Sequence, residues 1–413
     1  MGNSIITPSM IAKESLMAFK NQLGFTKSVN RRYSKEFAQS GAKVGDTINI
    51  RVPVQYEAKD GPVIDIQDTQ ERSVSLVLDQ HKHVGLQHSQ KDLTLSIDEF
   101  RERYIDEAVI ELANAVDFAG YSKCYQKVSN SVGVPSATAL PSTLKGFTQA
   151  KALMASIGAP VDNLTAIVDP FVEASLVEGL KGLFQSSEQI KQQYEKGIMG
   201  FAAGSKFKMS QNVVKHTIGA LGGTPAIKTT ITAQGAAAID CDGGSGNVTG
   251  YFKKGDVIQI GGVFAVNRRT RQTTGKLMQF VVTADCNMTS NEIASIPIFP
   301  AMYSDGPYKN VTALPIDGAA ITTFGHASSY KDIVAPQNLV FHKNAFVLGT
   351  ADFVLPDAGA KAARAVDEET GLSLTYTEQF DIHNYRTVRR LDILFGWEAV
   401  NPSFAARVVG EPA

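Results

Sequence analysis

The stretch that decides the fold is SIDEFRERYIDEAVIELANAVDFAGYSKCYQK, residues 96–127. Ser96 and Glu99 fit a capping box, in which each side chain satisfies a backbone amide at the start of a helix. At about 1.5 Å per residue, the strongest part of about 24 residues spans roughly 36 Å. The stretch therefore predicts a long spine helix. Its apolar residues recur every three or four positions, on one helical face: Ile97, Phe100, Tyr104, Ala108, Leu112, Val116 and Ala119.

The bulk composition is that of a globular protein. The chain has 413 residues, of which 43% are hydrophobic and 20% are charged, so we expect two or three domains with ample core. A net charge of −1 gives the whole molecule no attraction to nucleic acid or to membranes. The sequence shows no signal segment and no apolar run near the ~20 residues of a membrane span. The three cysteines are few and odd in number, so we expect a protein of a reducing compartment that has neither a disulfide framework nor a cysteine zinc site.

Residues 1–43 form a basic arm, in which seven lysines and arginines face two glutamates. A short helix is expected over residues 9–19. Two interpretations remain open for the arm: a solvated terminus, or a segment that contacts a polyanion, because basic side chains release counterions from phosphates. Without a recognition-helix or finger pattern, sequence-specific reading of nucleic acid is not expected.

Residues 44–88 predict an extended hairpin. The first strand, in GDTINIRVPVQY, alternates apolar and polar residues, and Asp60-Gly61-Pro62 supplies the turn. The second strand, in RSVSLVLDQHKHVGL, returns with one apolar face. Such a hairpin has bare edges, which invite pairing with another chain. We expect that chain to be another copy.

The rest of the chain predicts an α+β body that is interrupted by an insertion. A helix over 143–157, a buried strand over 164–168 and a helix from Asp169-Pro170 to about residue 184 precede it. Residues 220–335 are rich in Gly, Thr, Ala and Val and nearly lack helical periodicity, which predicts an all-β, barrel-like module. Its expected strands are 226–232, 256–266, 277–284 and 293–298, and residues 240–250 are expected to form a protruding loop. After it we expect strands at 339–347, 353–355, 372–376, 387–397 and 405–409, with a short helical turn within 357–365.

The search for catalytic and ligand-binding motifs favours neither an enzyme nor a cofactor. Residues 244–250 miss the dinucleotide-binding spacing by one position, and Leu277 follows Gly275-Lys276 where a phosphate-binding loop needs Ser or Thr. His81 and His83 share a strand face at metal-like spacing, but His88 has the opposite parity. We therefore favour a polar strand surface over a metal site. Asp240 and Asp242 lack the further ligands of a calcium loop.

The order of these parts resembles the major capsid (coat) proteins of short-tailed phages, whose Hong Kong 97-type fold carries an inserted domain. The segments that carry the resemblance are LTLSIDEFRERYIDEAVIELANAVD, YEKGIMGFAAG, YFKKGDVIQIGGVFAVNRRTRQTTGKLMQFVV and RRLDILFGWEAVNP. The resemblance implies an N-terminal arm (1–43), an E-loop hairpin (44–90), a peripheral domain with the spine helix (91–142), an axial domain (143–219 and 336–375), the inserted β domain (220–335) and a return to the peripheral domain (376–413).

The resemblance also implies a structural protein that self-assembles into the icosahedral shell of a tailed double-stranded DNA phage. Its expected partners are copies of itself in pentamers and hexamers, a scaffolding protein, a portal, packaged DNA without sequence specificity and, as a further candidate, a decoration protein, with no membrane. Its expected location is the virion capsid, assembled in the host cytoplasm. Two rivals remain: a cellular encapsulating compartment of the same fold, and a hydrolase with a β-rich accessory domain, which predicts a cluster of groups with perturbed pKa values.

Charged residues on the exposed parts are candidate contacts, and each has the alternative of being ordinary solvated surface. Opposite charges on one loop suit a two-fold contact between copies. The candidates for contact between subunits are Arg51, Lys59, Asp60, Asp240, Asp242, Lys253 and Lys254. The candidates for contact with DNA or scaffold in the interior are Lys20, Lys27, Arg31, Arg32 and Lys35.

Overall fold

The computed structural model describes residues 8–31, 45, 47–56, 58, 61–62, 66, 71–89, 106–136, 138–180, 200–323, 331–356, 359–367, 372–384 and 386–411. The chain divides into two compact units. Unit 1 comprises Met1–Arg51, Ser73–Tyr121 and Phe346–Val400, and unit 2 comprises Val52–Arg72, Ser122–Ala345 and Asn401–Ala413. Among the described residues, no helix is both long enough and apolar enough to cross a membrane.

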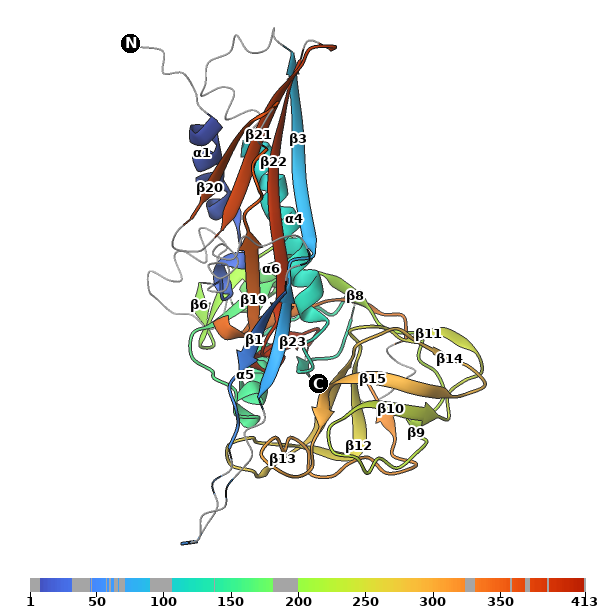
Figure 1. Ribbon diagram of the computed structural model, residues 1–413. Coiled ribbons are helices and arrows are strands. Elements are labelled where there is room, and N and C mark those ends of the chain that lie inside the picture. The colour runs from blue at the N-terminus through green and yellow to red at the C-terminus, as the bar shows by residue number, and fades with distance from the viewer. Residues whose placement is uncertain are drawn as a thin grey trace. The chain divides into compact units, whose positions relative to one another are not determined.

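Unit 1 is built on a five-stranded sheet in the order β19-β22-β21-β20, with β3 on the other edge of β22. Figure 1 shows β20, β21, β22 and β3 side by side, with α1 next to β20. The long strand β22 pairs with β21 and β19 along one edge and with β3 along the other. The elements are α1 (Pro8–Gln22), η1 (Thr26–Ser28), β1 (Thr47–Val52, whose last residue lies in unit 2), β2 (Arg72–Val77, whose first residue lies in unit 2), β3 (Gln80–Ser89), α4 (Asp106–Tyr125, whose last turn lies in unit 2), β19 (Phe346–Ala351), β20 (Lys361–Val366), β21 (Ser373–Asp381) and β22 (Arg386–Ala399).

The helix α4 confirms the predicted spine helix over its described part, and residues 96–105 lie outside the described residues. Its predicted apolar face is buried at Ala108, Leu112 and Val116. On the same helix, the buried Asp117 carboxylate accepts hydrogen bonds from the backbone amides of Gly24 and Thr26, at 2.6 and 3.0 Å.

The N-terminal segment is therefore fixed to its own unit. Leu16, Phe19 and Phe25 are buried, and Asp117 holds the chain that follows α1. Of the two interpretations of the basic arm, a solvated terminus is wrong for residues 8–31. Contact with a polyanion stays a prediction.

The predicted hairpin is present only in its first part. The strands β1 and β2 pair with each other, but β3 pairs with β22 along ten positions, from Gln80–Phe395 to Ser89–Arg386. The backbone groups of a long strand need partners, and β22 supplies them from the same chain. The expectation that the whole returning strand lacks cover from its own chain is wrong for residues 80–89.

Two local predictions after the insertion are also wrong. Residues 353–355 form no strand, and residues 361–366 form strand β20 instead of a helical turn. Alanine-rich sequence favours helix by intrinsic propensity. Pairing of β20 with β21, from Lys361–Glu378 to Val366–Ser373, overrides that preference.

Unit 2 contains a six-stranded sheet in the order β4-β23-β18-β5-β7-β6. The helices α5 and α6 and the strand β5 lie where the sequence predicted them, and Phe147, Leu164, Val172 and Phe207 contribute to one core. The elements are β4 (Ser131–Val132), α5 (Lys145–Ser156), β5 (Leu164–Val168), α6 (Pro170–Leu180), β6 (Phe201–Ala202), β7 (Ser205–Met209), β8 (Lys215–Thr217), β17 (Val334–Pro336), β18 (Asn338–Phe341), η5 (Lys343–Ala345), η6 (Pro402–Phe404) and β23 (Ala405–Val408).

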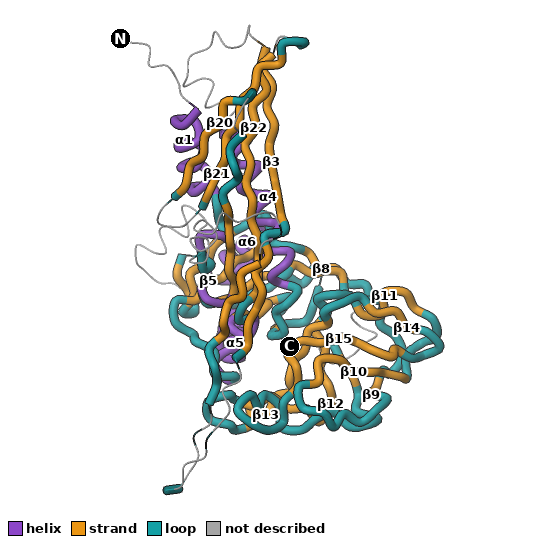
Figure 2. The backbone as a smooth tube through the Cα atoms, in the orientation of Figure 1, coloured by secondary structure: helices purple, strands orange, loops and turns teal. Residues whose placement is uncertain are grey.

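The insertion in unit 2 is a closed β-barrel, shown by its strands in Figure 2. Six strands follow the order β16-β12-β13-β15-β10-β9. A bridge between Ala226 and Ala320 and a 2.8 Å hydrogen bond from Ile227 N to Ala319 O join the two ends of this order and close the ring of strands. This confirms the predicted all-β module. Its strands are β9 (Ala226–Ile227), β10 (Ala236–Asp242), β11 (Val248–Phe252), β12 (Val257–Val266), β13 (Thr273–Val282), β14 (Cys286–Met288), β15 (Ile293–Met302) and β16 (Ile321–Thr322).

The glycine-rich segment 240–250 is more ordered than its sequence predicts. Asp240 and Asp242 belong to β10, and residues 248–250 belong to β11. The linking residues are tied to the next hairpin, because Asn291 Oδ1 accepts from Gly246 N and Asn247 Oδ1 accepts from Ser290 N. The expected long protruding loop is thus reduced to residues 243–247.

Candidate functional site

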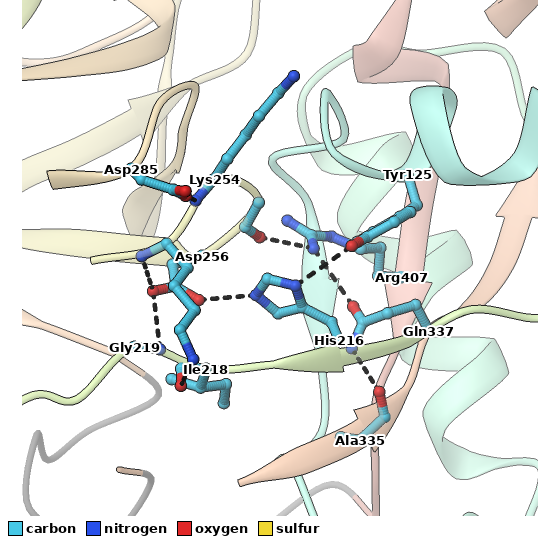
Figure 3. Close-up of polar contacts among 12 residues, drawn as sticks. Tyr125, His216, Ile218, Gly219, Lys254, Asp256, Asp285, Ala335, Gln337 and Arg407 are labelled. Carbon is cyan, nitrogen blue, oxygen red and sulfur yellow. Dashed lines mark hydrogen bonds and ion pairs between the residues drawn. The ribbon is translucent and has the colours of Figure 1, made fainter. Parts of the chain in front are cut away.

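The chain enters and leaves the barrel through two short paired strands, which we call the neck. In the neck, β8 and β17 are antiparallel, with His216 opposite Ala335 and Thr217 opposite Val334. A set of buried polar side chains surrounds these strands in unit 2, as Figure 3 shows. We call it the neck network: Tyr125, His216, Asp256, Gln337 and Arg407.

His216 is the centre of the neck network. Its Nε2 atom lies 2.7 Å from Asp256 Oδ1, and its Nδ1 atom lies 3.3 Å from the Tyr125 hydroxyl (Figure 3). A carboxylate only accepts hydrogen bonds, so Nε2 carries a proton and donates it to Asp256. Burial raises the pKa of Tyr125, which keeps the hydroxyl protonated and able to donate. The two ring nitrogens therefore contact both neighbours at once.

Asp256 joins the barrel to the strand that enters it. Its second oxygen, Oδ2, accepts from Gly219 N at 3.1 Å and from Lys253 N at 2.8 Å. Gly219 follows β8, and residues 253–256 form the turn between β11 and β12. A Cβ atom at position 219 would lie 2.2 Å from Tyr251 O, so only glycine fits this close approach. The carboxylate thus fixes the barrel turn against the neck.

Arg407 brings the six-stranded sheet of unit 2 into the same network from β23. Its side chain is buried, and its Nη1 atom donates to Gly255 O at 2.8 Å and to Gln337 Oε1 at 3.2 Å. Burial lowers the pKa of Arg407 to about 10, although Tyr125 and Asp256 oppose that shift. A buried cation with directional donors holds its acceptors in fixed positions. The neck network therefore acts as a brace between barrel and sheet.

The candidate contacts between subunits do not form one cluster. Asp240 and Asp242 are half-buried in β10, and Lys253 Nζ lies 3.5 Å from Ile218 O near the neck. Lys254 is exposed, and its backbone amide donates to Asp285 at 2.7 Å. Within the described chain, no hydrogen bond or ion pair joins either aspartate to either lysine. Arg51 is exposed on β1, and Lys59 and Asp60 lie outside the described residues.

The candidate interior residues are also dispersed. Lys20 makes an ion pair with Asp367 at 2.8 Å, so part of its charge is already compensated within unit 1. Lys27 is exposed and Arg31 is half-buried. Arg32 and Lys35 lie outside the described residues.

Sequence reasoning missed the neck network. The available signal was Arg407, a charged residue inside the apolar run FAARVV, which is a costly place for an unpaired cation. His216 and Asp256 stand 40 positions apart, and neither belongs to a recognisable motif. Only the fold brings them together.

Comparison with known proteins identifies the class first: the chain is a structural capsid protein of a phage, and its α+β architecture with an inserted barrel is of the predicted Hong Kong 97-type. A model of one family, P22 coat protein (gene protein 5), matches residues 3–410. The chain belongs to the P22 coat protein family.

Solved structures similar to this chain include capsid structures at low identity. A chain of the capsid of Ralstonia phage GP4 has a TM-score of 0.47 at 10% identity, with 100% of this chain and 93% of that chain covered. A chain of Mycobacterium phage Che8 has a TM-score of 0.45 at 11% identity, with 94% and 90% covered. A virus-like particle from Pyrococcus furiosus has a TM-score of 0.39 at 7% identity, with 95% of each chain covered. A comparison with curated proteins found no match.

Proposed function

We propose that this major capsid protein forms the pentamers and hexamers of an icosahedral shell, assembled in the host cytoplasm around a scaffold and a portal and later filled with double-stranded DNA. It catalyses no reaction in this role. The observation that carries the proposal is the coat-protein family match over residues 3–410. The contacts with DNA are electrostatic and without base readout.

Exposed apolar side chains support burial against other copies. Phe171, Phe201 and Met209 are each more than 60% exposed in unit 2. Exposed large apolar side chains mark interaction surfaces when they gather in patches, and each that becomes buried contributes about 1.5–3 kcal/mol. In a shell, neighbouring subunits provide that cover.

The domain assignment is part of the same proposal. Residues 1–43 form the arm, 44–90 the E-loop, 91–142 and 376–413 the peripheral domain, 143–219 and 336–375 the axial domain, and 220–335 the inserted domain. In this assignment the β1–β2 ribbon lies over a neighbouring subunit. The two strands form a separate two-stranded sheet, which leaves backbone groups on its outer edges for another chain.

We further propose that the inserted barrel meets its counterpart across a two-fold axis through Asp240, Asp242, Lys253 and Lys254. On the E-loop, Arg51, Lys59 and Asp60 contact a neighbour. The basic residues Lys20, Lys27, Arg31, Arg32 and Lys35 face the interior. The exposure of Lys254 and the half-exposure of the two barrel aspartates support the first contact.

The test is assembly of the full chain expressed with and without the scaffolding protein of its phage. Electron microscopy and sedimentation should show closed shells or capsomers, and a monomer under both conditions would refute the proposal. Shells that enclose a cellular enzyme instead of DNA would favour an encapsulating compartment.

The two-fold contact has its own variants. Lys254→Glu should lower the yield of closed shells, and adding Asp240→Lys and Asp242→Lys should restore it. Asp317→Lys is the matched control, because Asp317 is an exposed barrel aspartate outside the proposed contact. If the unchanged protein, Lys254→Glu, the triple variant and Asp317→Lys all gave equal yields of closed shells, these residues would not form the two-fold contact. The proposed shell function would still stand.

A further inference from the structure

Three potential metal ligands lie together on one face of the unit 1 sheet. His81 and His83 are two positions apart on β3, so their side chains point to the same side. The register places His83 directly opposite Asp392 on β22, with His81 opposite the next residue of that face, Leu394. One ligand atom from each of His81, His83 and Asp392 lies within 4.8 Å of the other two.

The three side chains differ in exposure in a way that suits an ion. Asp392 is 7% exposed and fixed in the middle of the sheet, whereas both histidines are exposed and accessible to an ion from solvent. His81 Nε2 lies 2.6 Å from Asp392 Oδ1. The ring of Phe353 packs against the ring of His81, with centroids 4.7 Å apart, and restricts how the imidazole can turn. Two of the ligands are thus already oriented.

We propose that His81, His83 and Asp392 bind a divalent transition-metal ion, with zinc the best fit. Imidazole nitrogen and carboxylate oxygen are both ligands of zinc, and two histidines with one carboxylate form a common three-ligand set. Three protein ligands leave a fourth position for water. The site is independent of the shell function, which neither requires nor excludes it.

The main obstacle is Arg390, whose cation shares the same carboxylate. Its Nε and Nη2 atoms lie 2.8 and 2.7 Å from Asp392 Oδ1, and Nη2 lies 3.4 Å from His81 Nε2. The hydrogen bonds that reach the Asp392 carboxylate all go to Oδ1, so Oδ2 is left without a donor from the described residues and can bind the ion. Arg390 then remains on Oδ1, outside the ligand set, as a competing cation. Because its charge opposes the ion, we expect weaker binding than at the same ligand set without a neighbouring cation.

The test is metal binding by the unassembled full chain, prepared without a histidine tag. Cobalt(II) titration should produce visible ligand-field absorption that saturates at one ion per chain, and zinc should displace cobalt. Competition with a chromophoric chelator gives the zinc affinity. His83→Ala should weaken zinc binding by at least about tenfold, because removal of an outer partner alone commonly costs that much.

Three comparisons keep the test decisive. His83 is exposed, so His83→Ala should fold normally, which fluorescence of the buried Trp397 can verify. His383→Gln, in an exposed turn of the same unit, should bind zinc as the unchanged protein does. Arg390→Gln should tighten binding, since it removes the competing cation. Equal affinities for His83→Ala and His383→Gln, or no zinc binding by the unchanged chain, would overturn the proposal, and neither result bears on assembly.

Discussion

Gly120 of α4 lies directly against the indole ring of Trp397 on β22. A Cβ atom at position 120 would lie 2.3 Å from Trp397 Cε2, well inside van der Waals contact. The indole is fully buried, and the ring of Phe25 stacks on it with centroids 5.2 Å apart. The glycine therefore allows the spine helix to approach the sheet closely at this point.

Gly120→Ala should destabilise unit 1 by about 1–3 kcal/mol, because the extra methyl group forces the helix or the indole to move in a packed core. The measurement is urea unfolding followed by the fluorescence of Trp397, the only tryptophan in the chain. Gly85→Ala in β3 is the control, since a Cβ atom there meets nothing within 4 Å. A Gly120→Ala protein as stable as Gly85→Ala would contradict the close contact.

Asp256→Ala should loosen the barrel at the neck. It removes the acceptor of the buried His216 and Gly219 hydrogen bonds and of the partly buried Lys253 hydrogen bond, and each buried donor left unsatisfied costs about 1–3 kcal/mol. Limited proteolysis should cut the neck segments faster, and hydrogen exchange should accelerate at Gly219. Asp285→Ala, which removes one exposed hydrogen bond to Lys254, is the matched control. Cleavage and hydrogen exchange should be faster in Asp256→Ala than in Asp285→Ala. Equal rates in the two variants would argue against the neck network as a brace.

Glu378 should make unit 1 sensitive to acid. Burial acts to raise the pKa of Glu378, but hydrogen bonds from Tyr376 and Arg389 and the charge of Arg389 outweigh it and hold the pKa below its usual value of 4.5. The ionised form is thus favoured in the folded state, so its stabilisation is present above pH 4.5 and is lost as the pH falls through the folded pKa.

The check is the unfolding free energy of unit 1 measured between neutral and acidic pH. Glu378→Gln should be less stable than the unchanged protein at neutral pH, and the difference should shrink in acid. Glu107→Gln, at an exposed position of α4, should keep the profile of the unchanged protein. If the difference in unfolding free energy between Glu378→Gln and the unchanged protein stayed constant with pH, the lowered pKa of Glu378 would be refuted.

The barrel cysteines should resist thiol reagents until the barrel opens. Burial raises the pKa of Cys241 to about 12 and that of Cys286 to about 11, so both remain thiols at pH 8 and only the thiolate is reactive. In a Cys124→Ser background, labelling by a disulfide reagent should be slow in the native protein and should reach two thiols in denaturant. Ser245→Cys adds an exposed thiol in the barrel and should react at once. Rapid labelling of the native Cys124→Ser protein, which lacks the added thiol at position 245, would contradict the burial of Cys241 and Cys286.

The parts of the fold that were predicted correctly depend on local pattern. The strand Leu164–Val168 and the helix Lys145–Ser156 carry their periodicity and their end signals within a dozen residues. The all-β character of the inserted domain was predictable, because a glycine-rich sequence with strand-like runs and no helical spacing is compatible with few structures other than a barrel or sandwich.

The errors and omissions depend on distant pairing. A helical turn was predicted within residues 357–365, but residues 361–366 pair with strand β21, which overrides that preference. Asp392 stands 311 positions from His81, so the sequence offered two ligands of a set whose third was invisible. Arg407 and Gly255 are 152 positions apart, and no spacing rule connects them.

The neck also makes the barrel a removable cassette. Thr217 and Val334 already face each other as they would at the end of a tight hairpin, so a two-residue turn could close the chain there without shifting either flanking strand. Whatever the barrel contributes to a lattice can therefore be lost, swapped or resized through one short junction, provided that Arg407 of the sheet finds another acceptor in place of Gly255 O.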